Sequence, residues 1–274
     1  MGKITAVEVN KLRKMSGAGI MDCKKALVES NGDFDSAIEV LRKKGQKVAA
    51  KRADRESSEG AVIAKVSSDF TKGVIISLNC ETDFVAKNES FLDLANNIAE
   101  AALECENLDE LLNYKIDSIT ISEKLLEQTG VIGEKLVVGN FEKLSSNYVG
   151  KYIHAGNKIA TLSGLSLNID GIEEVSKNIA MQAAAMNPIA LDENGVDKQT
   201  IDKEIEIAKD QLRQEGKPEG MLDNIAKGKL KRFFKDNTLI NQDFIKDNKQ
   251  SVSAYIKSFN EELKVVGFKR VSLL

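Results

Sequence analysis

Residues 61–78 read AVIAKVSSDFTKGVIISL. Two segments rich in Val and Ile, 61–67 and 73–78, flank the polar run 68–72, and this pattern is typical of a β-hairpin. A helix is predicted next, because apolar residues recur on one helical face from Phe91 to Ala102. The order strand, strand, helix is therefore the first unit of the predicted fold.

The same order appears again downstream. Segments 148–153 and 158–163 indicate a second hairpin around the turn 154–157. The helix expected after it aligns four apolar residues, Val175, Ile179, Ala183 and Met186. Both helices contain Asn-Ile-Ala, at 97–99 and 178–180. We infer a duplicated strand–strand–helix core of class α+β.

This repeat sets the expected domain boundaries. Residues 61–140 should form the first core half, and residues 141–274 the second. A strand over 136–141 should join one of the two sheets, and a strand over 265–273 should return to the second half.

The first 45 residues predict three short helices. Thr5 and Glu8 have the spacing of a capping box, and the run 16–19, with two glycines, should end the first helix. The third helix is expected to stop at Gly45. Three helices of this length make only a small core, so residues 1–45 are interpreted as a docking module. Residues 46–60 are interpreted as a helical extension that fades into a linker to the core.

Residues 197–235, inserted in the second half, predict a protruding antiparallel coiled-coil hairpin. Apolar residues are spaced by three or four positions in both predicted helices, and the remaining positions are highly charged. The seam residues are Ile201, Ile205, Ala208, Leu212, Leu222, Ala226, Leu230 and Phe233.

Composition excludes several classes of protein. The chain has 274 residues, one histidine and three cysteines, which argues against a zinc finger or a disulfide framework. No apolar run is long enough to span a bilayer, and residues 1–5 lack the apolar segment of a signal peptide, so a cytoplasmic protein without membrane contact is expected. Residues 1–56 hold 13 Lys and Arg against 8 Asp and Glu, too small an excess to indicate nucleic-acid binding.

No catalytic pattern stands out. The sequence contains neither a phosphate-binding G-x-x-x-x-G-K-[ST] loop nor a G-x-G-x-x-G motif after a strand. The single histidine, His154, has no nucleophile in evident register. We therefore expect a protein that is not an enzyme and that carries no cofactor and no metal.

Three segments suggest binding instead. Phe84, in the loop 81–88, either fills the core or forms an exposed apolar wedge, because aromatic residues are favoured anchors in interfaces. Ile20 and Met21 are adjacent, so one of them is expected to point outward. The basic stretch 227–235 is either a solvated helix face or an RNA contact.

These segments resemble bacterial elongation factor Ts. The resemblance extends over essentially the whole chain, and its two long motifs, 16–27 and 82–88, are highly specific. The remaining matching segments are 31–33, 41–45, the hairpin around His154, and 267–270. Ser16 and Ile20 depart from the threonine and methionine that are common in this family.

The resemblance implies a nucleotide exchange factor for the GTPase elongation factor Tu, in its GDP-bound and nucleotide-free forms. The head, similar to a ubiquitin-associated domain, would dock through Ile20 and Met21, and the hairpin turn with His154 and Gly156 would hold another domain of the GTPase. A central loop would disturb the magnesium and phosphate sites of the GTPase; its residues are Thr82, Asp83, Phe84 and Val85. The coiled-coil hairpin would also reach the partner.

Two other functions stay open. An RNA- or ribosome-binding module would use the basic head and the stretch 227–235, although the acidic composition of the chain disfavours it. A generic adaptor would bind helical partners through the three-helix head alone. Self-association through the core halves is also open.

Overall fold

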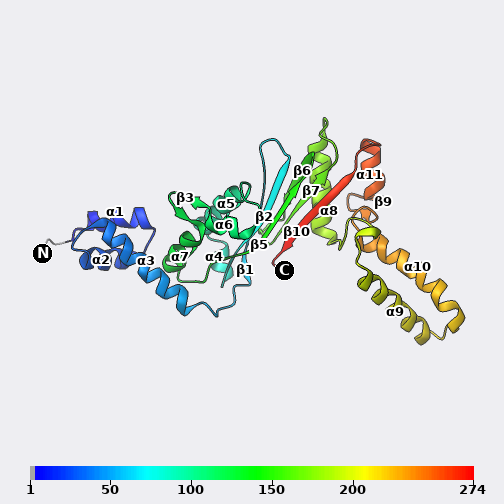
Figure 1. Cartoon of the computed structure of the whole chain (residues 1–274), viewed down its shortest axis with the longest axis horizontal. Coiled ribbons are helices and arrows are strands. Elements are labelled where there is room, and N and C mark those ends of the chain that lie inside the picture. The colour runs from blue at the N-terminus through cyan, green and yellow to red at the C-terminus, as the bar shows by residue number, and fades with distance from the viewer. Residues whose placement is uncertain (1–3) are drawn as a thin grey trace.

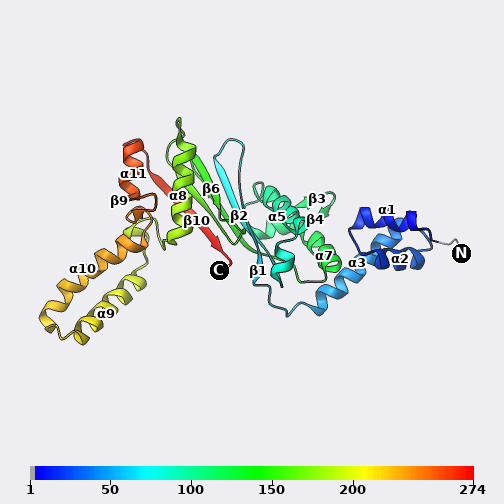
Figure 2. The same cartoon turned by 180° about the vertical axis from the view of Figure 1, so that it is seen from behind.

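The computed structural model describes residues 4–274 and shows an elongated α+β molecule (Figure 1). A small helical head lies at one end, a mixed core lies in the middle, and a helical hairpin projects from the other end (Figures 1 and 2). The α+β class predicted from the sequence is confirmed. Of the segment in which a signal peptide was sought, residues 1–3 lie outside the described residues.

Three helices form the head: α1 (Ala6–Ser16), α2 (Ile20–Glu29) and α3 (Phe34–Lys51). The predicted capping box of Thr5 is present, and the chain leaves α1 through Gly17 at a φ of 69°, which favours glycine. The hydrophobic core of the head contains the buried residues Val9, Leu12, Ala18, Cys23, Ala26, Leu27 and Ala37.

One boundary prediction for the head was wrong. Helix α3 does not stop at Gly45 but continues to Lys51, so the helical extension expected after Gly45 is present as part of the same helix. Gly45 is buried against α7 (Ile121–Ile132), where a Cβ atom would lie 2.9 Å from the Leu126 carbonyl oxygen. The glycine therefore permits a close helix crossing and does not terminate the helix.

The first sheet has the strand order β1-β2-β5, all antiparallel: β1 (Glu59–Val66), β2 (Lys72–Cys80) and β5 (Val137–Ser145). Helix α5 (Glu89–Ala102) covers one face of it. Alternate residues of β1 serve different layers, as expected for a strand. Ala61 and Ile63 pack in the cluster under α5, whereas Val62 and Ala64 face the second sheet.

The second sheet has the order β10-β7-β6, also antiparallel: β6 (Tyr148–Ile153), β7 (Ile159–Leu165) and β10 (Val265–Ser272). Helix α8 (Ile172–Met186) packs on its outer face, and the inner faces of the two sheets meet. The predicted pairings of the strands near 136–141 and 265–273 are confirmed. Met186, expected to be aligned with the buried face of α8, is instead 44% exposed, because it is the last residue of that helix.

Several elements were not predicted. Apart from α7 they are short: α4 (Asp83–Ala86), α6 (Leu108–Asn113), β3 (Lys115–Ile116), β4 (Ile119–Thr120), a 3-10 turn (Glu193–Gly195), β8 (Asp243–Phe244), β9 (Asp247–Ser251) and α11 (Val252–Phe259). Helix α7 is the important one, because it carries the contact with α3. Its start has a complete capping box between Thr120 and Glu123, the same pattern that marked α1.

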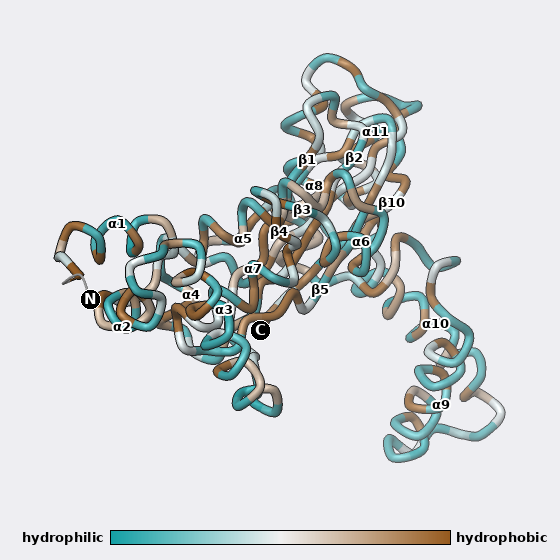
Figure 3. The backbone as a smooth tube through the Cα atoms, turned by 60° about the vertical axis from the view of Figure 1, so that its left-hand side comes forward, coloured by the Kyte–Doolittle hydropathy of each residue, from teal (hydrophilic) through white to brown (hydrophobic). Residues whose placement is uncertain are grey.

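Helices α9 (Lys198–Gln214) and α10 (Glu219–Asn237) form the projecting hairpin. Most of its residues are hydrophilic (Figure 3). The fully buried residues of its seam are Ala208, Leu212, Leu222 and Ala226. Ion pairs, such as Lys209 with Asp223 at 2.9 Å, join the two helices beside this seam.

Candidate functional site

Phe84 lies on α4, a single helical turn between β2 and α5. Its side chain is 83% exposed, although Cys80 before it and Ala86 after it are both buried. Of the two alternatives for Phe84, the structure therefore shows the exposed one. The buried neighbours hold this large aromatic side chain in solvent. Such exposure of apolar surface is unusual and suggests an interface.

Glu134 fixes the start of this loop. Its carboxylate accepts hydrogen bonds from the Glu81 N–H at 3.2 Å, the Thr82 N–H at 3.0 Å and the Thr82 hydroxyl at 2.7 Å. The Thr82 hydroxyl oxygen also accepts from the Val85 N–H at 3.5 Å and so caps α4. These bonds set the backbone two residues before Phe84.

The Glu81 carboxylate makes the reverse contact, from the loop to the segment that follows α7. The Glu81 side chain accepts from the Lys135 N–H at 2.7 Å and from the Arg52 guanidinium at 2.8 and 2.7 Å. The hydrogen bond from the Lys135 N–H has the largest effect, and together with the Arg52 contacts it holds the pKa of Glu81 below its ordinary value. The Lys135 ammonium also donates to the carbonyl groups of Ala53 and Arg55, so the end of the head is tied to the base of the loop.

Asp83 presents a charge beside Phe84. It pairs with Lys87 at 2.6 Å, and this hydrogen-bonded ion pair lowers the pKa of Asp83. The turn 154–157 lies at the same edge of the molecule as α4, because Lys158, directly after the turn, pairs with Glu59, and Glu59 lies opposite Cys80 in the β1–β2 pairing. The remaining predicted loop residue, Val85, is partly buried against the first core.

His154 and Gly156 lie on the exposed turn between β6 and β7. Gly156 adopts a φ of 87°, which favours glycine, and the His154 ring nitrogen Nδ1 lies 3.0 Å from the Tyr152 hydroxyl. The turn is anchored on the first sheet, because the Val62 N–H donates to the Asn157 carbonyl at 2.7 Å. The predicted turn and the Phe84 loop are thus brought to one edge, whereas the head residues lie apart from both (Figure 1).

Ile20 and Met21 begin α2 and are 50% and 62% exposed. The sequence predicted that one of the two points outward, and the structure shows that both do. The reason is that Cys23, Ala26 and Leu27 already supply the buried face of this short helix.

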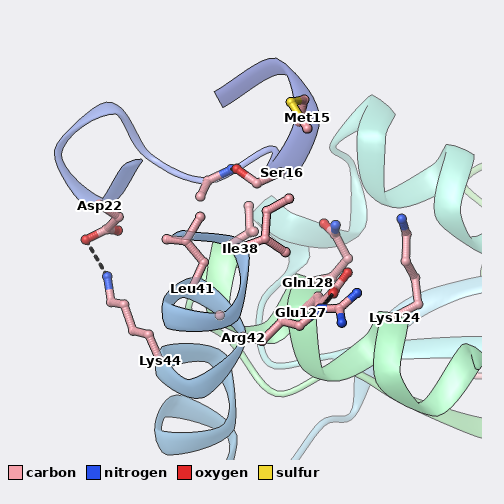
Figure 4. A pocket seen from close by; sticks show the side chains of 13 residues that line it. Met15, Ser16, Asp22, Ile38, Leu41, Arg42, Lys44, Lys124, Glu127 and Gln128 are labelled. Atoms are coloured by element: carbon pink, nitrogen blue, oxygen red, sulfur yellow. Dashed lines mark hydrogen bonds and ion pairs between the residues drawn. The ribbon is translucent and has the colours of Figure 1, made fainter. Parts of the chain in front are cut away.

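A cavity of about 180 Å³ lies between the head and α7 (Figure 4). Apolar residues of the head, such as Ile38 and Leu41, line it from one side, and Gln128 lines it from α7. The ion pair of Arg42 with Glu127 joins the head to α7 here. The cavity is part of the head–core joint.

Three of the five basic residues in the stretch 227–235 form ion pairs. Lys229, Arg232 and Lys235 pair with Glu215, Asp236 and Asp243 respectively. Within residues 4–274, no group of three His, Cys, Asp or Glu residues could hold a metal ion, and no helix is long and apolar enough to cross a membrane.

Sequence reasoning missed Glu134, Lys135 and Arg52. No local pattern marks Glu134, because the backbone groups that it binds lie 53 and 52 residues earlier in the chain. The αL glycine Gly133, which ends α7 at a φ of 84°, is the one nearby signal for the turn that presents it.

The sequence of this chain is similar to the sequences of known proteins. The family model described as Elongation factor TS matches residues 81–273. A protein named elongation factor Ts from Christiangramia forsetii is 68% identical over 273 residues, and one from Flavobacterium psychrophilum is 65% identical over 273 residues; both alignments cover 100% of each chain. A Porphyromonas gingivalis relative of the same name is 46% identical and covers 98% of each chain. The chain belongs to the elongation factor Ts family of translation elongation factors.

Proposed function

We propose that this chain is a guanine nucleotide exchange factor that binds elongation factor Tu and promotes release of GDP, without making or breaking a covalent bond. The observation that supports this most is the exposed Phe84 on a hydrogen-bonded loop, in a member of the elongation factor Ts family. An exposed aromatic residue on a fixed backbone can enter a partner without first losing much conformational freedom.

The mechanism follows from linkage. An exchange factor binds the nucleotide-free GTPase more tightly than the GDP-bound form, and it weakens GDP binding by the same ratio. Each tenfold weakening requires about 1.4 kcal/mol of differential contact. A buried aromatic hot spot contributes roughly 2 to 4 kcal/mol, so Phe84 alone supplies more than one factor of ten.

We assign the wedge to Thr82, Asp83, Phe84 and Val85. Phe84 enters the nucleotide-binding domain and displaces elements that hold the magnesium ion and the phosphates. Loss of the ion weakens GDP further, because magnesium bridges the phosphate oxygens to the protein.

Other surfaces hold the partner without acting on the nucleotide. Ile20 and Met21 dock the head on the same domain of the GTPase, and the turn with His154 and Gly156 holds a second domain. The head lies apart from the loop, whereas the turn lies at the same edge as the loop (Figure 1). The elongated molecule can therefore hold one site on the partner through the head while the turn binds next to the wedge. The helical hairpin adds a further contact.

The test is release of fluorescent GDP from elongation factor Tu, with this chain and with its Phe84→Ala variant. The wild type should accelerate release strongly, and the variant should be about 30- to 1,000-fold less effective, which is the rate equivalent of 2 to 4 kcal/mol. Phe70→Ala is a matched control, because Phe70 is a half-exposed aromatic residue on another loop. A wild type that leaves GDP release unchanged, with active partner, would contradict the proposal.

A further inference from the structure

The turn after α7 is built to hold the loop that carries Phe84. Gly133 ends α7 in the left-handed conformation and aims the Glu134 carboxylate at the loop. Glu134 then accepts three hydrogen bonds, from two backbone N–H groups and one hydroxyl, all belonging to Glu81 and Thr82. A carboxylate suits this position because it is purely an acceptor.

The contact is reciprocal, which makes it stronger than a single cap. Glu134 binds the backbone at Glu81 and Thr82, while the Glu81 carboxylate binds the backbone N–H of Lys135. Two carboxylates therefore lie close together, and the Arg52 guanidinium binds one of them with two hydrogen bonds. Charge-assisted bonds of this kind are about twice as strong as neutral ones.

The same turn also connects to the head. Arg52 and the acceptor carbonyl groups of Ala53 and Arg55 follow directly after α3, the last helix of the head. Helix α7, which leads into Gly133, crosses α3 at Gly45 and Gly130 so closely that a Cβ on Gly130 would lie 2.5 Å from the Gly45 Cα. A continuous packed path therefore runs from the head to the loop.

We propose that Glu134 is a positioning residue for nucleotide exchange: it locks the backbone that presents Phe84 and couples this loop to the docked head. This inference rests on the proposed exchange function. In this role Glu134 acts on exchange through Phe84 and needs no contact of its own with the partner or the nucleotide.

The first experiment measures the loop in the free protein. The sequence contains no tryptophan, so a Phe84→Trp variant places a single fluorophore at the tip of the loop. Glu134→Gln should increase the fast loss of its fluorescence anisotropy, because a neutral amide oxygen accepts from the two backbone N–H groups more weakly than a carboxylate does, and the amide NH₂ cannot accept from the Thr82 hydroxyl. Glu142→Gln, which breaks an ion pair with Lys269 between β5 and β10, is the matched control and should leave the anisotropy unchanged.

A second readout uses the chemistry beside the loop. The Cys80 thiol donates to the Thr82 carbonyl oxygen at 3.2 Å; burial, followed by the Glu134 charge, raises its pKa to about 11. Alkylation of Cys80, followed by peptide mass spectrometry, should therefore be slow in the wild type and faster in Glu134→Gln. Thr82→Val should also speed it, whereas Thr82→Ser, which retains the hydroxyl, should restore the slow reaction.

The third experiment separates positioning from general stability. Glu134→Gln should slow GDP release about tenfold in the wild-type background and by less than twofold in the Phe84→Ala background, because the loop then carries no wedge. Equal losses in both backgrounds would overturn the positioning role. Unchanged anisotropy in Glu134→Gln would overturn it as well. A wild type inactive in exchange would instead overturn the proposed function, while the anisotropy still reports on the lock.

Discussion

The two halves of the core make the same strand-to-helix connection in opposite ways. After β2, residues 81–88 hold Phe84 in solvent. After β7, residues 166–171 turn their large apolar side chains, Leu167 and Ile169, toward the second hydrophobic core. The order of strands and helix is the same in both halves.

The difference lies in what fixes each backbone. The second connection is held by its own apolar contacts and by two hydrogen bonds with Lys264, in which the Ser166 N–H donates to the Lys264 carbonyl and the Ser166 hydroxyl accepts from the Lys264 N–H, both at 2.9 Å. The first connection is held by polar groups of Glu134 and Lys135 and does not use its large aromatic side chain. Polar anchoring leaves the aromatic side chain free for a partner.

The largest expected effect is the contrast between removing the large apolar side chain of the first connection and removing one from the second. Phe84→Ala should leave the free energy of unfolding within about 0.5 kcal/mol of the wild type, because the exposed side chain makes few packing contacts. Ile169→Ala should lower it by about 1 to 3 kcal/mol yet change GDP release less than twofold. Urea unfolding, run alongside the release assay, measures both. Loss of stability in Phe84→Ala would remove the contrast between the two connections.

The next prediction tests whether the packing of the head on α7 helps to fix the backbone of the first connection. Gly130→Ala should cost about 1 to 3 kcal/mol in unfolding free energy, because the new methyl group would meet the backbone of Gly45. It should also slow exchange, since the head shifts relative to the loop. Gly228→Ala on α10 is the control: nothing lies within 4 Å of its Cβ, so it should stabilise by roughly 0.5 to 1 kcal/mol.

A smaller effect distinguishes docking from displacement. Met21→Ala should raise the concentration of factor needed for half-maximal GDP release by about tenfold while leaving the maximal rate unchanged, as expected for a contact that holds both forms of the partner equally. Val28→Ala, on the same helix and 58% exposed, serves as the comparison. A lower maximal rate in Met21→Ala would assign the head a part in displacing the nucleotide.

The smallest effect concerns pH. The folded-state pKa values of Glu81 and Asp83 lie below their ordinary values of 4.5 and 3.8. Their contribution to the loop is therefore fully present above those values and is lost as the pH falls through the lower folded-state pKa. The tryptophan anisotropy of the Phe84→Trp variant should stay constant from about pH 8 to about pH 5 and fall only below about pH 4. Glu81→Gln should weaken this transition, and a change near neutral pH would contradict it.

Periodicity alone predicted the skeleton of the fold. The hairpins, α5, α8 and the two helices of the projecting hairpin follow from residue spacing, because each buries one face of a regular element. The same reasoning could not place α7, although Thr120 and Glu123 mark its start, and it ended α3 too early at Gly45. A glycine in a helix indicates an end or a close packing contact, and only the neighbouring helix decides which.

The sequence predicted only part of the candidate site. A large aromatic residue between a strand and a helix fits either the core or an interface, and the family resemblance, rather than periodicity, favoured exposure. The structure shows the cause of this exposure. Polar groups that lie more than 50 residues away in the chain fix the loop backbone, so the aromatic side chain need not be buried to hold it. Long-range contacts of this kind leave no local pattern.

The most direct test of the wedge compares two affinities. The equilibrium constants for binding nucleotide-free and GDP-bound elongation factor Tu should be measured for the wild type and for Phe84→Ala by titration calorimetry. We expect the wild type to prefer the nucleotide-free form by a large factor, and the variant to lose about 30- to 1,000-fold of that preference. Equal affinity of the wild type for both forms, or an unchanged ratio in Phe84→Ala, would contradict the wedge.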